Sequence, residues 1–281
     1  MNRAPGPRLI VTADDFGADE AVNEAVERGY RDGILTAASL MVTGAAVADA
    51  VARARTMPGL GVGLHLVLVE GVPALPPEAV PGLVDAAGRF RTDMARMGAD
   101  IFFRPAVRRQ LAAEITAQFE RFAATGLPLD HVNAHKHYHL HPTIASLILA
   151  IGRRYGMRAA RAPVEPRGVL RRIEPAPATI DIAAPWARLV RYRLRRHGMI
   201  VPDQVFGLAW SGAIEPRRLA GLIGALPEGL SEIYLHPATD DDWPGHAPGY
   251  RYRAELAALL DAGILNALEA AGVTRGRFAD F

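Results

Sequence analysis

Short apolar runs alternate along the chain with longer stretches in which apolar residues recur every three to four positions. The first run, residues 8–13, predicts a buried strand, and the amphipathic stretch behind it predicts a helix over 18–33 that ends at Gly33. Further strands are predicted at 36–42, 60–66, 129–135, 157–163, 203–209 and 230–236. Further helices are predicted at 45–57, 105–126, 142–156, 186–198, 215–226 and 250–272.

Strands that alternate with helices predict an α/β fold with a parallel sheet, and about seven such units favour a TIM-barrel-like (β/α) barrel over an open sheet. Two segments fit no element: a Pro- and Gly-rich stretch at 69–103 and a Pro-rich one at 163–184. The chain shows no internal repeat and no long linker, so we expect a single domain over 1–281.

The composition narrows the possible classes of protein. Of the 281 residues, 50% are hydrophobic and 22% are charged, which allows a large core. The net charge of +2 gives no reason to expect binding to nucleic acid. There are no cysteines, which excludes disulfides and thiolate metal sites. The N-terminus has only a short apolar run followed by two acids, unlike a signal peptide or a membrane span, so a cytoplasmic protein is the default expectation.

Acidic and histidine side chains stand at the ends of four predicted strands: Asp14 and Asp15, His65, His135, and His236. Taken singly, an acid after a strand is often a helix N-cap, and a strand histidine is often a buried core residue. In parallel α/β folds, however, the carboxyl ends of the strands meet on one face, where catalytic groups lie. The coincidence of four such ends favours a shared site.

One Asp and two His form a sound ligand set for Zn²⁺ or a neighbouring divalent ion and leave a coordination position open. Such an ion lowers the pKa of a bound water and polarises a carbonyl oxygen. A second carboxylate could accept a proton from the water, and a further histidine could protonate the leaving group. These residues therefore predict a metal-dependent hydrolase.

Four motifs, in order along the chain, resemble the YdjC-like carbohydrate deacetylases, which include the chitooligosaccharide deacetylases. They are TADDFG (12–17), GLHL (63–66), the His-x-His-x-His of residues 135–139, and LHP (235–237). The resemblance implies a distorted (β/α) barrel and a metal site of Asp15, His65 and His135. It also implies that Asp14 is the general base and His236 the general acid. One difference is Asn133, where many relatives have an acid.

Within that family the motifs look most similar to hopanoid biosynthesis-associated deacetylases. This implies removal of the N-acetyl group of an N-acetylglucosaminyl hopanoid lipid. As cofactor we expect one divalent ion, Zn²⁺ in preference to Mg²⁺ or another divalent ion. We expect His137 and His139, which would alternate with His135 on the outgoing strand, to line the pocket or to support the metal ligands from behind. Phe102 and Phe103, close to Met94, Met97 and Ile101, are expected to form a wall for the apolar tail, or else a packed loop.

Other interpretations remain open at this stage. The arginine-rich helix 186–198 could touch anionic headgroups at the inner membrane surface, although basic surface helices are common. The substrate could be a soluble chitooligosaccharide or another amide or ester. The protein could also bind a metal or glycan without catalysis, but such a protein has no use for a spare carboxylate such as Asp14. The sequence carries no signal for an oligomeric state.

Overall fold

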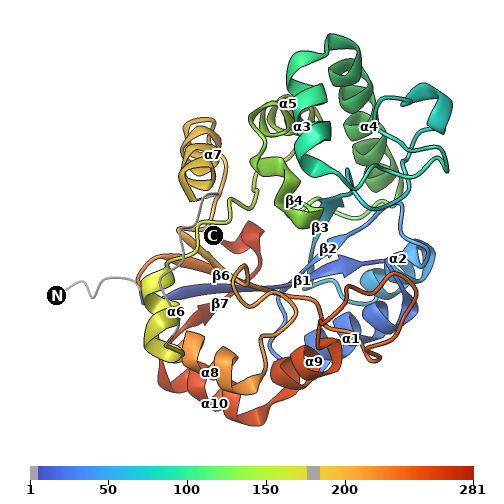
Figure 1. Cartoon of the computed structure of the whole chain (residues 1–281). Helices are drawn as coiled ribbons and strands as arrows, with labels where there is room; N and C mark the ends of the chain where they lie inside the picture. The colour runs from blue at the N-terminus through green and yellow to red at the C-terminus, as the bar shows by residue number, and fades with distance from the viewer. Residues whose placement is uncertain (1–5, 176–183) are drawn as a thin grey trace.

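The computed structural model describes residues 6–175 and 184–281, and its centre is a parallel sheet (Figure 1). The strands lie in the order β4-β3-β2-β1-β6-β5, and the short β7 pairs with the start of β1. Their bounds are β1 Arg8–Phe16, β2 Ala37–Leu40, β3 Gly61–Leu66, β4 Val132–Ala134, β5 Gln204–Phe206, β6 Leu230–Leu235 and β7 Thr274–Arg275. The long apolar runs of β1, β3 and β6 are buried along their whole length apart from Arg8, as expected for strands covered on both faces.

Helices cover both sides of the sheet. In Figure 1, α3, α4 and α5 lie above it, and α1, α8, α9 and α10 lie below it. Their bounds are α1 Glu20–Arg31, α2 Val47–Arg55, α3 Met94–Phe103, α4 Pro105–Ala124, α5 Pro142–Gly152, α6 Arg167–Ile173, α7 Ala184–Arg196, α8 Pro216–Gly224, α9 Tyr252–Leu260 and α10 Ala262–Ala270. Within the described residues, no helix combines the length and the apolar character needed to cross a bilayer.

The predicted strand at 157–163 is extended chain that bridges the two edges of the sheet. Its Arg161 N–H donates to the carbonyl of Val132 at the β4 edge (3.1 Å), and its Ala160 N–H donates to the carbonyl of Ile200 (3.0 Å). Only isolated bridges form here, so the prediction of a regular strand was wrong. The parallel strands nevertheless form a curled half-barrel covered by helices, which confirms the predicted α/β, barrel-like fold class.

Two predicted boundaries were wrong for identifiable reasons. The end of the stretch expected to be irregular, 69–103, forms α3, because Asp93 accepts a hydrogen bond from the Arg96 N–H and Met97 and Ile101 bury one helix face. The expected single helix at 250–272 is divided at Asp261, whose carboxylate caps the N-terminus of α10. The Pro-rich segment 163–184 contains α6, and residues 176–183 of it lie outside the described part.

The histidine run does not continue the strand before it. β4 ends at Ala134, and His135–Leu140 forms 3-10 turns in which Lys136 (φ 51°) and His137 (φ 53°) are left-handed. The expectation that His137 and His139 alternate with His135 along a strand was therefore wrong. The left-handed pair turns the chain sharply, and this turn directs each histidine to a different neighbour.

A buried carboxylate ties the C-terminal segment to the amino end of the barrel. Asp130 accepts hydrogen bonds from the backbone N–H groups of Phe278 (3.3 Å) and Ala279 (3.0 Å) and from Nδ1 of His131 (3.0 Å). Burial would raise the pKa of Asp130, but the hydrogen bond and charge of His131 and the two backbone donors outweigh it and lower that pKa below 3.8.

We predict that Asp130→Asn lowers the free energy of unfolding by about 1–3 kcal/mol at neutral pH, because the backbone donors lose a charged acceptor. The folded-state pKa of Asp130 is depressed below 3.8, its ordinary value. The contribution of its carboxylate to the free energy of unfolding is therefore fully present above pH 3.8 and is lost as the pH falls through the folded-state pKa. Urea unfolding should show the same difference in free energy of unfolding between wild type and Asp130→Asn at pH 7 and at pH 5. At pH 3.5 this difference should be smaller. Asp32→Asn, which changes an exposed carboxylate, serves as the control. A difference between wild type and Asp130→Asn that does not change with pH would contradict this account.

Candidate metal centre

A kink at the end of β1 brings two consecutive acids into one pocket. Consecutive strand residues point to opposite faces, so a regular strand would separate Asp14 from Asp15. The pairing of β1 with β2 is irregular between Ala13 and Phe16, and Asp15 is left-handed (φ 63°). Both carboxylates consequently line the same cavity. The cost of this conformation in a non-glycine residue is consistent with a functional position.

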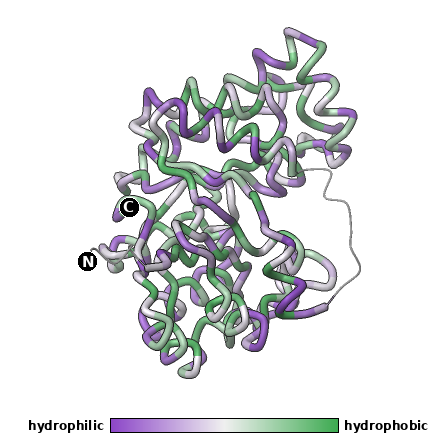
Figure 2. Tube along the Cα trace, turned by 90° about the vertical axis from the view of Figure 1, so that its left-hand side faces the viewer, coloured by the Kyte–Doolittle hydropathy of each residue, from purple (hydrophilic) through white to green (hydrophobic). Residues whose placement is uncertain are grey.

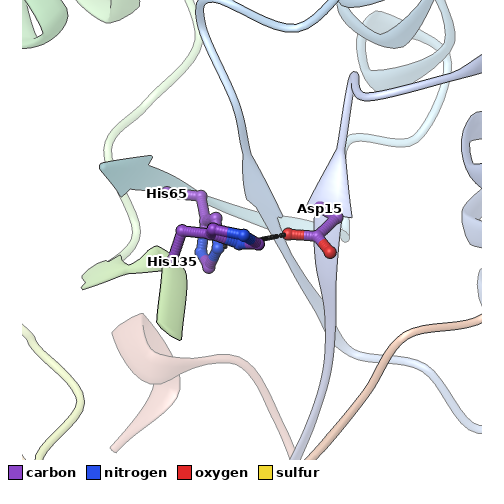
Figure 3. A group of neighbouring side chains, drawn as sticks. All are labelled: Asp15, His65 and His135. Carbon is purple, nitrogen blue, oxygen red and sulfur yellow. Dashed lines mark hydrogen bonds and ion pairs between the residues drawn. The ribbon is translucent and has the colours of Figure 1, made fainter. Parts of the chain in front are cut away.

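Asp15, His65 and His135 form the one cluster of ligand-type side chains within the described residues that could hold a metal ion (Figure 3). Oδ1 of Asp15 lies 3.3 Å from Nε2 of His65 and 3.2 Å from Nδ1 of His135. Two ligands about 2.1 Å from a tetrahedral zinc ion would lie roughly 3.4 Å apart, so these separations suit such an ion. Figure 3 shows the His135 ring directed at the Asp15 carboxylate, with a dashed line between them, and the His65 ring overlapping it in this view.

A buried hydrogen-bond chain fixes the orientation of His65. Its Nδ1–H donates to Oδ1 of Asn133 (2.7 Å), which leaves Nε2 unprotonated in the neutral ring and without a hydrogen-bond partner among the described residues. The amide of Asn133 donates to Ser39 (2.8 Å), and the Ser39 hydroxyl lies 3.0 Å from Nε2 of His131. Since His131 is held by Asp130, the chain runs through the barrel interior to the metal centre.

Asp14 is held by a buried arginine. The guanidinium of Arg161, which is fully buried, donates to both carboxylate oxygens of Asp14 (2.5 and 3.0 Å) and to Glu232 (2.7 Å). Burial would raise the pKa of Asp14, but the charge and hydrogen bonds of Arg161 outweigh it and hold that pKa well below its ordinary value. Asp14 is therefore anionic and fixed in position.

The charges around the cluster fit a divalent cation. Asp14, Asp15 and Glu232 are buried carboxylates, and Arg161 is the buried guanidinium among them. Three formal negative charges and one positive charge give these side chains a net charge of −2. Burying this charge is costly unless a cation binds. Together with the unpartnered Nε2 of His65, this deficit means that Asp15, His65 and His135 are suited to hold one divalent ion.

The cluster opens into a cavity of about 420 Å³, a volume typical of small-ligand sites. The other side chains around it come from β6, from the start of α9 and from the segments that follow β3, β4, β5 and β6. They include Glu70, Lys136, His137, Leu208, Ser211, Tyr234, His236, His246, Tyr250 and Tyr252. Nε2 of His137 lies 2.8 Å from the Tyr234 hydroxyl, and burial is the first cause that lowers the pKa of His137 far below 6.5. His137 thus lines the pocket as a neutral imidazole.

His236 faces the same cavity from the end of β6. Its backbone N–H donates to the buried carboxylate of Glu255 (2.5 Å), which also accepts from the N–H of Ile214 (2.8 Å). Its ring lies edge-on to Tyr234 and Tyr250, with centroids 5.7 and 5.1 Å away. The position of the His236 ring is thus fixed by its backbone and by aromatic neighbours.

The structure separates three residues expected in the pocket from the metal cluster. His139 is buried in a different, small cavity with Asn133 and Arg161, and burial is the main cause that lowers its pKa to about 3. Phe102 and Phe103, at the end of α3, are 50% and 77% exposed, contact each other edge-to-face, and do not line the cavity. Phe102 and Phe103 do not touch the site, whereas His139 lies behind the pocket lining with its ring edge-on to that of His137 (centroids 5.9 Å apart).

Sequence reasoning missed the buried charges that support the cluster. Arg161 lies among several arginines of an ordinary-looking stretch, and Glu232 and Glu255 lie inside an apolar strand and a helix. Nothing in their spacing distinguishes them from surface residues. The one available signal was a charged residue at a position that the strand pattern expects to be apolar, as with Glu232 in LSEIYL.

Several bacterial proteins are similar in sequence to this chain. A carbohydrate deacetylase from Geobacillus stearothermophilus is 29% identical over 276 residues, 97% of each chain. A chitooligosaccharide deacetylase from Yersinia pestis is 29% identical over 285 residues, 97% of this chain and 98% of that protein. A carbohydrate deacetylase from Brevibacillus brevis is 41% identical, but over 148 residues, about half of either protein.

The fold is shared with a solved structure. A crystal structure from Enterococcus faecalis V583, of a protein described as a candidate for cellobiose-phosphate cleavage, superposes with a TM-score of 0.77 and 25% sequence identity over 98% of both chains. Residues 8–270, from the start of β1 to the end of α10, match the family described as YdjC-like protein. The chain belongs to the YdjC-like protein family.

Proposed function

We propose that this protein is a carbohydrate deacetylase that hydrolyses the N-acetyl group of an N-acetylglucosaminyl substrate, with the chain 1–281 acting as one catalytic domain. The observation that carries the proposal is the placement of Asp15, His65 and His135 in one cavity with the anionic Asp14 and with His236. The deacetylase names of relatives aligned over nearly the whole chain support the same reaction.

In this proposal Asp15, His65 and His135 hold one divalent ion, with zinc the best match for two imidazoles and a carboxylate. When bound, such an ion polarises the acetamide carbonyl and lowers the pKa of a water molecule. The chain contributes a preset geometry: Asn133 fixes the tautomer of His65, and the kink at Asp15 aims its carboxylate between the two rings.

Asp14 and His236 carry the proton transfers in this scheme. Asp14 accepts a proton from the water that attacks the acetamide carbon, and Arg161 keeps its carboxylate in place. His236 gives a proton to the departing nitrogen as the C–N bond breaks, so that acetate and a free amino sugar form. The low pKa of Asp14 makes it a weak base, and its contribution depends on position more than on basicity.

For the substrate, we propose an N-acetylglucosaminyl glycolipid such as acetylglucosaminyl hopanoid, met by a cytoplasmic enzyme at the inner membrane surface. A soluble chitooligosaccharide is the second candidate, supported by the name of the Yersinia relative. Because Phe102 and Phe103 lie outside the cavity, an apolar tail that reached them would do so on the protein surface. A binding protein without catalysis is disfavoured by the fixed carboxylate of Asp14 beside the metal cluster.

The metal assignment predicts that His135→Ala largely abolishes uptake of Zn²⁺, since two ligands seldom hold the ion. Elemental analysis after dialysis against Zn²⁺ should show near-stoichiometric metal in the wild type and very little in the variant. His197→Ala, which removes an exposed histidine after α7, is the matched control and should retain the metal. Full occupancy in the His135 variant would rule this ligand set out.

The assigned roles predict that Asp14→Asn lowers kcat by about 10²–10⁴-fold while the metal content stays unchanged, because an amide cannot accept the proton. His236→Ala should lower kcat by a similar factor. Release of acetate from N,N′-diacetylchitobiose measures both, and circular dichroism checks the fold of each variant. Near-normal turnover in one variant would remove that residue from the mechanism, and Asp32→Asn controls for a lost surface charge.

The glycolipid proposal predicts a higher kcat/KM for an N-acetylglucosaminyl hopanoid in detergent than for the fully N-acetylated trisaccharide, called chitotriose below. If the tail reaches Phe102 and Phe103, changing both to Ser should raise KM for the glycolipid at least tenfold and leave KM for chitotriose unchanged, since burial contributes about 25 cal/mol per Å². Equal effects on KM for both substrates would mean that Phe102 and Phe103 have only a structural role and do not contact the lipid tail. A wild type that prefers chitotriose would leave the soluble sugar as substrate.

A further inference from the structure

The outer face of α7 combines exposed apolar side chains with arginines. Trp186, Leu189 and Tyr192 recur every three residues along the helix and are 50%, 41% and 58% exposed. Figure 2 faces the side of the molecule on which α7 lies and shows hydrophobic and hydrophilic residues mixed along it. Large apolar side chains that remain exposed on one helix face often mark a binding surface.

The charge of α7 has one sign only. The helix contains five arginines and no acid. Among the described residues, Arg195 pairs with Asp203 (2.7 Å) and Arg191 donates to the Asp203 carbonyl, whereas Arg188 and Arg193 pair with no acid. Positive charges without acidic partners beside exposed aromatic rings are typical of helices that lie in a membrane interface.

A groove of about 320 Å³ runs between α7 and α5 beside this face. Its floor is apolar, formed by Ala145, Leu149, Ala150, Val190 and Leu194. Its rim carries Arg153 from the end of α5, and Arg193 and His197 from the end of α7, together with Ser146. An apolar floor with a cationic rim complements a molecule that has an acyl chain and an anionic headgroup.

We propose that the α5–α7 surface, defined as this groove and the exposed face of α7, is a docking site for anionic phospholipid in a bilayer. The headgroup lies among Arg153, Arg193 and His197, and an acyl chain covers the groove floor. Trp186 and Tyr192 insert at the level of the headgroups, where such rings are enriched. The helix has 13 residues and lies in the interface without crossing it.

This site is separate from the metal pocket, because none of its residues lines that cavity. Lipid docking and hydrolysis of a soluble sugar can therefore be measured independently, and either can fail without the other. A second copy of the chain is a poorer occupant, since two such surfaces would bring unpaired arginines together.

The test is flotation of the purified full-length protein with vesicles of phosphatidylcholine alone or with 30 mol% phosphatidylglycerol as a chosen composition, at about 0.1 M salt. We expect binding to the anionic vesicles only. Because an arginine near such a surface contributes about fivefold in affinity, Arg153→Glu/Arg193→Glu should weaken binding about 25-fold or more. Deacetylation of chitotriose by this variant should stay unchanged, which shows that it is folded.

Two further variants distinguish binding at the α5–α7 surface from non-specific attraction between the protein and anionic vesicles. Arg217→Glu/Arg253→Glu makes the same charge change on α8 and α9, which lie below the sheet in Figure 1 whereas α7 lies above it, and this variant should lose much less affinity. Trp186→Ser/Tyr192→Ser keeps every charge and should weaken binding about tenfold or more through lost apolar contact.

Four results would overturn the proposal. They are no flotation with anionic vesicles, equal binding to neutral vesicles, equal losses in the two charge-reversal variants, or binding of soluble glycerol phosphate as tightly as of vesicles. The last would identify a site for a free anion. Self-association that disappears in Trp186→Ser/Tyr192→Ser, seen by light scattering without vesicle binding, would instead make this surface an interface between copies.

Discussion

The candidate metal site depends on a buried ion pair between Arg161 and Asp14. Removing a charged arginine from water is costly, and losing one partner of such a buried pair typically costs about 3–5 kcal/mol. Arg161 is held by Asp14 on β1 and by Glu232 on β6, and its ring contact is Tyr234, whose centroid lies 4.4 Å from the guanidinium carbon. Arg161, in the extended segment 157–163, thus joins β1 and β6, the strands that lead to Asp14 and His236, the proposed base and acid.

Two local departures from regular backbone make the site possible. Because Asp15 is left-handed, two consecutive carboxylates point into one cavity: that of Asp15 lies against His65 and His135, and that of Asp14 against Arg161. The left-handed Lys136 and His137 end β4 directly after the strand, so that His135 reaches Asp15 while His137 reaches Tyr234. A regular strand at either place would send half of these side chains to the opposite face.

The polar interior connects stability with function. Asp130, His131, Ser39 and Asn133 form one hydrogen-bond chain that runs along the barrel to His65. The Asn133 amide donates to Ser39 and its oxygen accepts from Nδ1 of His65, so this chain fixes which ring nitrogen of His65 faces Asp15. The same side chains that anchor the C-terminal segment therefore orient a proposed metal ligand.

The sequence by itself determined the parallel barrel and the residues that meet at its carboxyl end, because burial on both faces produces long apolar runs and polar residues mark their ends. It could not determine that 157–163 bridges without a regular ladder, that α3 forms, or that the histidine run leaves the strand. These depend on backbone angles and on partners far along the chain. Only the tertiary structure decided that Arg161, Glu232 and Asn133 support the site, because a buried charge is recognisable by its distant partner and not by its neighbours in sequence.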